Sequence, residues 1–109
     1  MSLVELTEAN WQDSVEASPL PVLVDVWAPW CVPCRKVTPL VEQLATEMAD
    51  RLVVGTLNGD DCGRLMARYQ VLSLPTLLLL RGGDELTRVV GVPKMDKLRA
   101  VVEQHMEGD

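Results

Sequence analysis

At 109 residues, 48% of them apolar, the chain has the size and composition of one compact domain with its own core. Its 16 acidic residues outnumber its 10 basic ones and leave a formal charge of -6, so phosphate backbones and anionic membranes would repel it. We therefore expect residues 1–109 to form a single domain that binds neither nucleic acid nor membranes.

The sequence also indicates a compartment. The N-terminus has neither the basic start nor the apolar stretch of a secretory signal. The apolar run Thr76–Leu80 is far shorter than the roughly 20 residues that cross a bilayer. We therefore expect a soluble, cytoplasmic protein. In such a reducing compartment, two cysteines separated by two residues indicate redox or metal chemistry more often than a structural disulfide.

The first half of the chain predicts two strands, each followed by a helix. Leu3–Leu6 can form a short strand, and Thr7 is a plausible N-cap for the helix after it. Val22–Trp27 is rich in valine and bounded by prolines, which predicts a central strand buried on both faces. A helix is expected from Cys34 onward, with a kink at Pro39. The core-facing residues of these helices would be Trp11, Val15, Val37, Leu40, Val41, Leu44 and Met48.

The second half predicts a strand, a short helix, a hairpin and a last helix. The strand is expected at Leu52–Leu57 and the short helix at Asp60–Tyr69. The hairpin would pair Thr76–Arg81 with Leu86–Val90 around Gly82-Gly83, and the last helix would run over Met95–Met106. The resulting order, β-α-β-α-β-α-β-β-α, requires a parallel core sheet closed on one side by an antiparallel hairpin. We therefore predict an α/β fold, a three-layer α/β/α sandwich with a mixed sheet of about five strands and four helices.

The paired thiols lie where the central strand gives way to a helix. If Val32 is the first helical residue, Cys31 is the N-cap, and the free amides and helix dipole there would lower the pKa of its thiol. Cys34, one turn further, would be shielded and able to resolve a mixed disulfide. A chance pairing or a zinc site remains an alternative, although zinc would need two more ligands. The remaining candidates, Cys62 and His105, are not at ligand spacing.

Asp25 lies inside the predicted central strand, a few residues before the thiols. If both faces of that strand are covered, the carboxyl is buried, and desolvation raises its pKa toward the range useful for proton transfer near neutrality. The alternative is an aspartate at a solvated strand end. The local sequence leaves both interpretations open.

Several separated segments together resemble the thioredoxin family. They are "DVWAPWCVPC" at Asp25–Cys34, Pro39 in the following helix, "LPT" at Leu74–Thr76, the Gly83 turn and "VVGV" at Val89–Val92. The similarity runs from about Leu6 to Val102. It implies a thioredoxin fold and a protein-disulfide reductase in which Cys31 attacks as an accessible thiolate and Cys34 resolves. It also implies that Asp25 acts as a base through water, with no metal or organic cofactor.

The resemblance also implies a substrate face. Pro75 would be cis, although an ordinary trans proline is the more frequent case for such a bond. The backbone of Leu74 would then be free to pair with an extended client segment. The apolar residues expected around Cys31 are Trp30, Val32, Pro33, Leu74, Val90, Gly91 and Val92. Taken singly, each of these residues is also compatible with plain packing.

Two positions depart from the family pattern and leave other functions open. Val32 stands where relatives usually have glycine, and Thr56 where they commonly have a lysine beside the carboxylate. The implied partners are disulfide-containing client proteins and a thioredoxin reductase, and we expect a monomer. One alternative is an oxidant, an isomerase or an electron donor for one client. The other is a thioredoxin-fold binding or chaperone module that needs no thiol chemistry.

Overall fold

The computed structural model describes residues 3–107, which contain one five-stranded mixed sheet. Its strands are β1 (Leu3–Leu6), β2 (Val22–Trp27), β3 (Val53–Asn58), β4 (Thr76–Arg81) and β5 (Asp84–Val90). Their order across the sheet is β1-β3-β2-β4-β5. The pairs β1-β3 and β3-β2 are parallel, whereas β4 runs antiparallel to both β2 and β5. The valine-rich segment β2 thus lies at the centre, as predicted.

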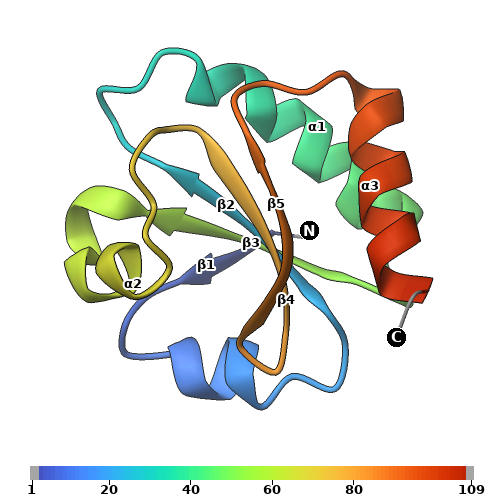
Figure 1. The fold of residues 1–109 in the computed structure, drawn as a ribbon, viewed down its shortest axis with the longest axis horizontal. Helices are drawn as coiled ribbons and strands as arrows, with labels where there is room; N and C mark the ends of the chain where they lie inside the picture. The colour runs from blue at the N-terminus through green and yellow to red at the C-terminus, as the bar shows by residue number, and fades with distance from the viewer. Residues whose placement is uncertain (1–2, 108–109) are drawn as a thin grey trace.

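Helices cover both faces of this sheet (Figure 1). Helices α1 (Cys34–Glu47) and α3 (Met95–Glu107) lie on one face, and α2 (Gly63–Arg68) lies on the other with a short π-helical segment, Gln12–Glu16. The predicted three-layer α/β/α sandwich is confirmed. None of the helices in the described part of the chain is long and apolar enough to span a membrane.

The helices and strands differ by more than one residue from their predicted limits in three places. The first helix is only a short π-helical segment, Gln12–Glu16. Thr7 caps the segment before it as predicted: its hydroxyl oxygen accepts a hydrogen bond from the Asn10 amide at 3.1 Å, and its amide donates to Oδ1 of Asn10 at 2.8 Å, the reciprocal pattern of a capping box. The expected helix from Asp60 is a 3₁₀ turn, Gly59–Asp61, followed by α2. Strand β5 begins at Asp84, because the turn needs only Gly82 and Gly83, both with positive φ.

Alternation along β2 divides the core into two clusters. Val22, Val24 and Val26 pack with the π-helical segment and α2. Leu23 faces the other way and packs with residues of α1 and α3. Because side chains alternate along a strand, Asp25 lies on the same face as Leu23 and points toward the α1 layer.

Candidate active site at the β2–α1 junction

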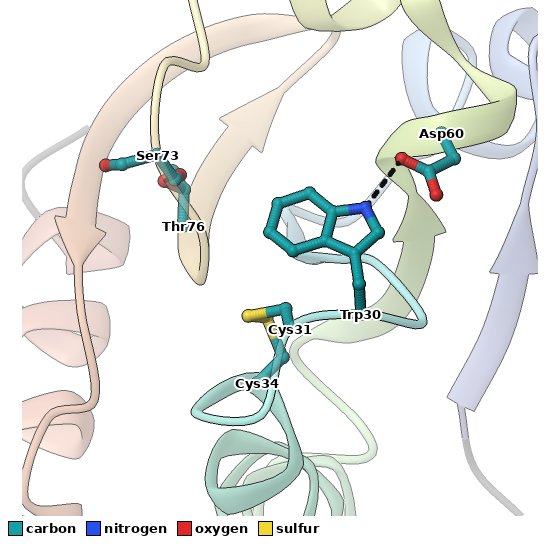
Figure 2. The surroundings of a disulfide bond; sticks show 6 residues. All are labelled: Trp30, Cys31, Cys34, Asp60, Ser73 and Thr76. Atoms are coloured by element: carbon teal, nitrogen blue, oxygen red, sulfur yellow. Dashed lines mark hydrogen bonds between the residues drawn. A yellow bond between two sulfur atoms is a disulfide. The ribbon is translucent and has the colours of Figure 1, made fainter.

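The segment between β2 and α1 carries a disulfide. Cys31 and Cys34 are bonded to each other, with their Cα atoms 5.4 Å apart. The Cys31 amide donates a hydrogen bond to the carbonyl of Ala28 at 3.1 Å, which fixes the turn in front of the helix. Figure 2 shows the two sulfur atoms between Trp30 and the loop that carries Ser73. The predicted cysteine pair is therefore one redox unit in the folded chain.

The helix begins later than the N-cap prediction requires. Helix α1 starts at Cys34, and Pro33 occupies the N-cap position, so the placement of Cys31 as N-cap is wrong. The amides of Arg35 and Lys36 donate to the carbonyls of Val32 and Pro33, which closes a tight turn before the regular helix. Cys31 lies just ahead of that turn. The lowered pKa of its thiol in the reduced protein stays a prediction.

Cys31 is also less accessible than expected. In this disulfide form the residue is only 4% exposed, so the expectation of an accessible outer cysteine is wrong for this state. The cause is packing from both sides, because Trp27 and Leu74 lie against the small cluster formed by Ala28 and the two cysteines. A molecule that reacts with the sulfur atoms must therefore approach them past these apolar side chains.

Asp25 is buried, as the strand pattern predicted. The residue is 1% exposed, and its Oδ1 accepts no hydrogen bond from the described residues. Burial raises the pKa of the Asp25 carboxyl to about 7. Its neighbours across the sheet are Thr56 on β3 and Leu77 on β4. The alternative of a solvated strand end is therefore excluded, and the residue that departs from the family pattern, Thr56, lies directly beside the carboxyl.

A cavity of about 450 Å³ connects the disulfide with this carboxyl. Both cysteines and Asp25 line it, together with Thr56 from β3 and Thr38 from α1. The rest of the wall consists of Trp27, Ala28, Pro29 and Arg35. The cavity therefore places a buried carboxyl and two hydroxyls next to the thiol pair.

The loop that precedes β4 forms the other side of the site. The peptide bond between Leu74 and Pro75 is cis, the isomer that the resemblance implied. The Gly91 amide donates a hydrogen bond to the Pro75 carbonyl at 2.9 Å, and the Thr76 hydroxyl donates to the Ser73 carbonyl at 2.6 Å. These two bonds tie the loop to the end of β5 and to its own strand.

Most of the predicted substrate-face residues are exposed around the disulfide or half-buried beside it. Trp30, Val32, Pro33, Val90 and Val92 are exposed, Leu74 and Gly91 are half-buried, and Pro75 is buried. Sequence reasoning missed Leu72, which precedes this loop and is 94% exposed. The sequence could have indicated this exposure, because Leu72 lies immediately before "SLPT" and belongs to no apolar helix or strand pattern.

Trp30 has a partner that the sequence did not reveal. Its side chain is largely solvent-exposed, and its indole Nε1 donates a hydrogen bond to Oδ1 of Asp60 at 3.1 Å (Figure 2). The Asp60 amide in turn donates to Oδ1 of Asn58 at 3.0 Å. Asp60 therefore orients the aromatic ring beside the disulfide.

Cys62 and His105 do not join this site. Cys62 is a buried free thiol, and burial is the main cause that raises its pKa. His105 lies on α3, where its Nδ1 is 2.9 Å from the Val101 carbonyl. Neither residue lines the cavity that holds the cysteine pair.

A cysteine pair that cycles between dithiol and disulfide on this scaffold defines a protein-disulfide oxidoreductase. Comparison with known proteins agrees with that class. The chain belongs to the thioredoxin family, whose model, described as Thioredoxin, matches residues 2–104. The chain is 42% identical over 95 residues to a thioredoxin of Pyropia yezoensis, covering 86% of this chain and 89% of that protein. It is 35% identical over 102 residues to thioredoxin 1 of a Nostoc species, covering 94% and 95%.

Proposed function

We propose that this chain is a general reductase of client proteins, carrying out a two-step thiol–disulfide exchange. The Cys31 thiolate attacks one sulfur of a client disulfide, forming a mixed disulfide while the other client sulfur leaves and takes up a proton. The Cys34 thiolate then attacks Sγ of Cys31 and releases the second client sulfur in the same way. The client gains two electrons and the cysteine pair is oxidised. The Cys31–Cys34 disulfide is the observation that carries this proposal.

Asp25 is proposed to accept the proton of Cys34 in the second step. Cys34 must lose its proton before it can attack, because the thiolate is the nucleophile. A base whose pKa lies near the working pH is suited to remove that proton and to lose it again. Support comes from the cavity that Asp25 and Cys34 share and from the pKa of about 7 that burial gives the carboxyl.

Clients are proposed to bind as extended segments along the loop that precedes β4. The backbone of Leu74 would pair with the client, as in strand addition. The exposed side chains of Trp30, Val32, Val90 and Val92 would then contact the client through apolar surface that does not depend on its sequence. We add Leu72 to this surface because it is the most exposed of the large apolar side chains.

The redox partner, the oligomeric state and the location of the protein are also proposals. A thioredoxin reductase would return electrons to the Cys31–Cys34 pair, since each client turnover leaves it oxidised. The protein would work as a single domain and a monomer in a reducing compartment such as the cytoplasm. There the pair would be kept in the dithiol form that the first step requires.

One observation favours a narrower function. Val32 is exposed between the two cysteines, where a β-branched side chain both stiffens the backbone and adds bulk beside the attacking sulfur. An electron donor for one client, or an oxidant or isomerase, would differ from a general reductase in two measurable properties. These are the reduction potential of the cysteine pair and the rate of insulin reduction.

A covalent trap tests the proposal. Cys34→Ser should retain clients from a cell extract as mixed disulfides on Cys31, whereas Cys31→Ser should retain none. Cys62→Ser in the trapping background is the matched control and should leave capture unchanged, because burial and nearby carboxylates raise the pKa of the Cys62 thiol and Cys62 does not line the cavity beside the disulfide. Capture that disappears with Cys62 would refute the assigned nucleophile. A double serine variant that keeps full biological activity would favour the binding-module alternative.

A further inference from the structure

The cavity beside the disulfide brings polar groups from three elements to one place. Asp25 comes from β2, Thr56 from β3, and Cys34 and Thr38 from α1, and all four line the cavity. Thr56 is the direct neighbour of Asp25 in the parallel pair β2-β3. Thr38 follows Cys34 by one helical turn, so the two side chains lie on the same face of α1. The two hydroxyls therefore flank the carboxyl and the resolving thiol.

The cavity satisfies the physical conditions for ordered water. A buried water needs a polar site with two to four hydrogen-bonding partners and roughly 10–15 Å³ of space open to a water-sized sphere. The cavity measures about 450 Å³, and Oδ1 of Asp25 is buried without a hydrogen bond from the described residues. A threonine hydroxyl both donates and accepts, so it can bind a water molecule while the same water contacts a carboxyl or a thiol.

We propose that Thr56 and Thr38 are positioning residues that hold water between Asp25 and Cys34 and between Asp25 and solvent, so that this carboxyl can take and release the thiol proton. In the resolving step, the proton leaves the Cys34 sulfur through that water and arrives on Asp25. The Cys34 thiolate forms the new bond to Sγ of Cys31, and the departing client sulfur takes a proton from solvent. Asp25 then loses its proton along the cavity. This inference rests on the proposed role of Asp25.

The charged groups around the carboxyl are few. Leu77 of β4 is apolar, β3 contributes Thr56, and α1 contributes Cys34, Thr38 and Arg35. Arg35 is exposed, and burial alone accounts for the raised pKa of Asp25. Among the cavity-lining residues, the two threonines therefore supply the hydroxyl groups that can stabilise the carboxylate through water.

A two-phase assay separates the steps. The fully reduced protein is mixed with the aromatic disulfide dithiobis(nitrobenzoate), and release of the coloured thiolate is followed by stopped flow. The first phase reports attack by Cys31 and depends on reagent concentration. The second reports resolution by Cys34 and does not, and Cys34→Ser should show the first phase alone. Cys62 is expected to react too slowly to contribute, because the raised pKa of its thiol leaves little thiolate at neutral pH.

The double variant Thr38→Val with Thr56→Val should slow the second phase about tenfold and leave the first unchanged, because positioned proton transfer contributes rate factors of this order or more. The pH at which the second phase becomes fast should move upward, since the carboxylate loses its hydrogen-bonded water. Serine at both positions should restore the rate. Thr87→Val, a half-buried threonine on β5, is the matched control and should change neither phase.

The outcomes separate this inference from the proposed function. If Asp25→Asn slows the second phase and the valine variants do not, the threonines have no positioning role while Asp25 keeps its own. If Asp25→Asn leaves the second phase unchanged, two claims are refuted: the role of Asp25 as the base and the role of the threonines in holding water for it. Should the double variant not fold, each single valine variant is expected to slow the second phase about threefold, and an unchanged rate in both would refute the inference.

Discussion

Asp25 illustrates how a single side chain links catalysis to stability. Its pKa in the folded protein is about 7, whereas an aspartate in an unfolded chain titrates near pH 4. Between these values the folded state holds a proton that the unfolded state has lost. Stability therefore falls as pH rises from about 4 to about 7 and stays at the lower level above that range.

We predict that Asp25→Asn stabilises the oxidised protein at alkaline pH. The free-energy difference between variant and wild type should grow by about 4 kcal/mol from pH 4 to pH 8, since only the wild type must bury a charge at the higher pH. Urea unfolding of the disulfide form at both pH values measures it. Asp13→Asn, which changes an exposed carboxylate, is the control and should show no comparable growth. If the free energies of unfolding of Asp25→Asn and wild type changed in parallel with pH, the Asp25 carboxyl would have an ordinary pKa and the prediction would be wrong.

At the scale of elements, β3 can lie close to β1 because of Gly55. A Cβ at this position would lie 2.6 Å from Cδ1 of Leu6 and 3.0 Å from the Val4 carbonyl oxygen. Leu6 belongs to the core cluster on that face and has little room to move. The close approach of β1 to β3 therefore depends on this glycine.

Gly55→Ala should lower the free energy of unfolding by about 1–3 kcal/mol, the usual cost of overpacking a core. Chemical denaturation monitored by tryptophan fluorescence measures it. Gly63→Ala is the matched control, because a Cβ there meets no atom within 4 Å. That variant should be neutral or slightly more stable. Equal effects at both glycines would contradict the close approach of β1 and β3.

The elements also show which parts of the fold follow from the sequence. The valines of β2 lie between prolines, and Gly82-Gly83 lies between two apolar runs, so local pattern alone predicts a central strand and a hairpin. Thr7 likewise predicts the cap before the first helix, but apolar periodicity does not reveal that the helix itself is only the short π-helical segment Gln12–Glu16.

Within the site, the cysteine pair and the buried carboxyl were predictable because each is defined by its own strand or turn. The remaining features depend on segments distant in the chain. Asp60 reaches Trp30 across a separation of 30 residues. The cover over Cys31 comes from Leu74, and the meeting of Thr38 with Thr56 requires both helix packing and strand register. Such contacts are decided by tertiary structure.

At the scale of the whole molecule, the exposed apolar side chains are unevenly distributed. Among the described residues, the large ones that are exposed are Val4, Trp30, Val32, Leu72, Val90 and Val92. Trp30 and Val32 adjoin the cysteines, and Leu72, Val90 and Val92 lie on the two segments that the hydrogen bond from Gly91 to Pro75 joins. Val4 lies on β1, at the opposite edge of the sheet from β5. Concentration of apolar surface in one place is typical of an interaction site.

Leu72→Ser should weaken client binding without changing the chemistry. We expect KM for insulin reduction to rise about 3- to 10-fold with kcat unchanged, the loss that follows from removing one buried apolar contact. Val4→Ser is the matched control, because this valine is also exposed, at 37%, yet lies away from the disulfide. An unchanged KM for Leu72→Ser would remove this residue from the docking surface.

The hydrogen bond from Gly91 to Pro75 joins the two segments on which a client would rest, and the bond from Thr76 to Ser73 closes the same loop on itself. A receptor edge fixed in this way is preorganised, so little of its own conformational entropy is lost when a ligand binds. The entropic cost of association therefore falls mainly on the client. Disulfides in mobile or unfolded segments, which can adopt an extended shape without disrupting a folded structure, should consequently react faster than those held inside rigid domains.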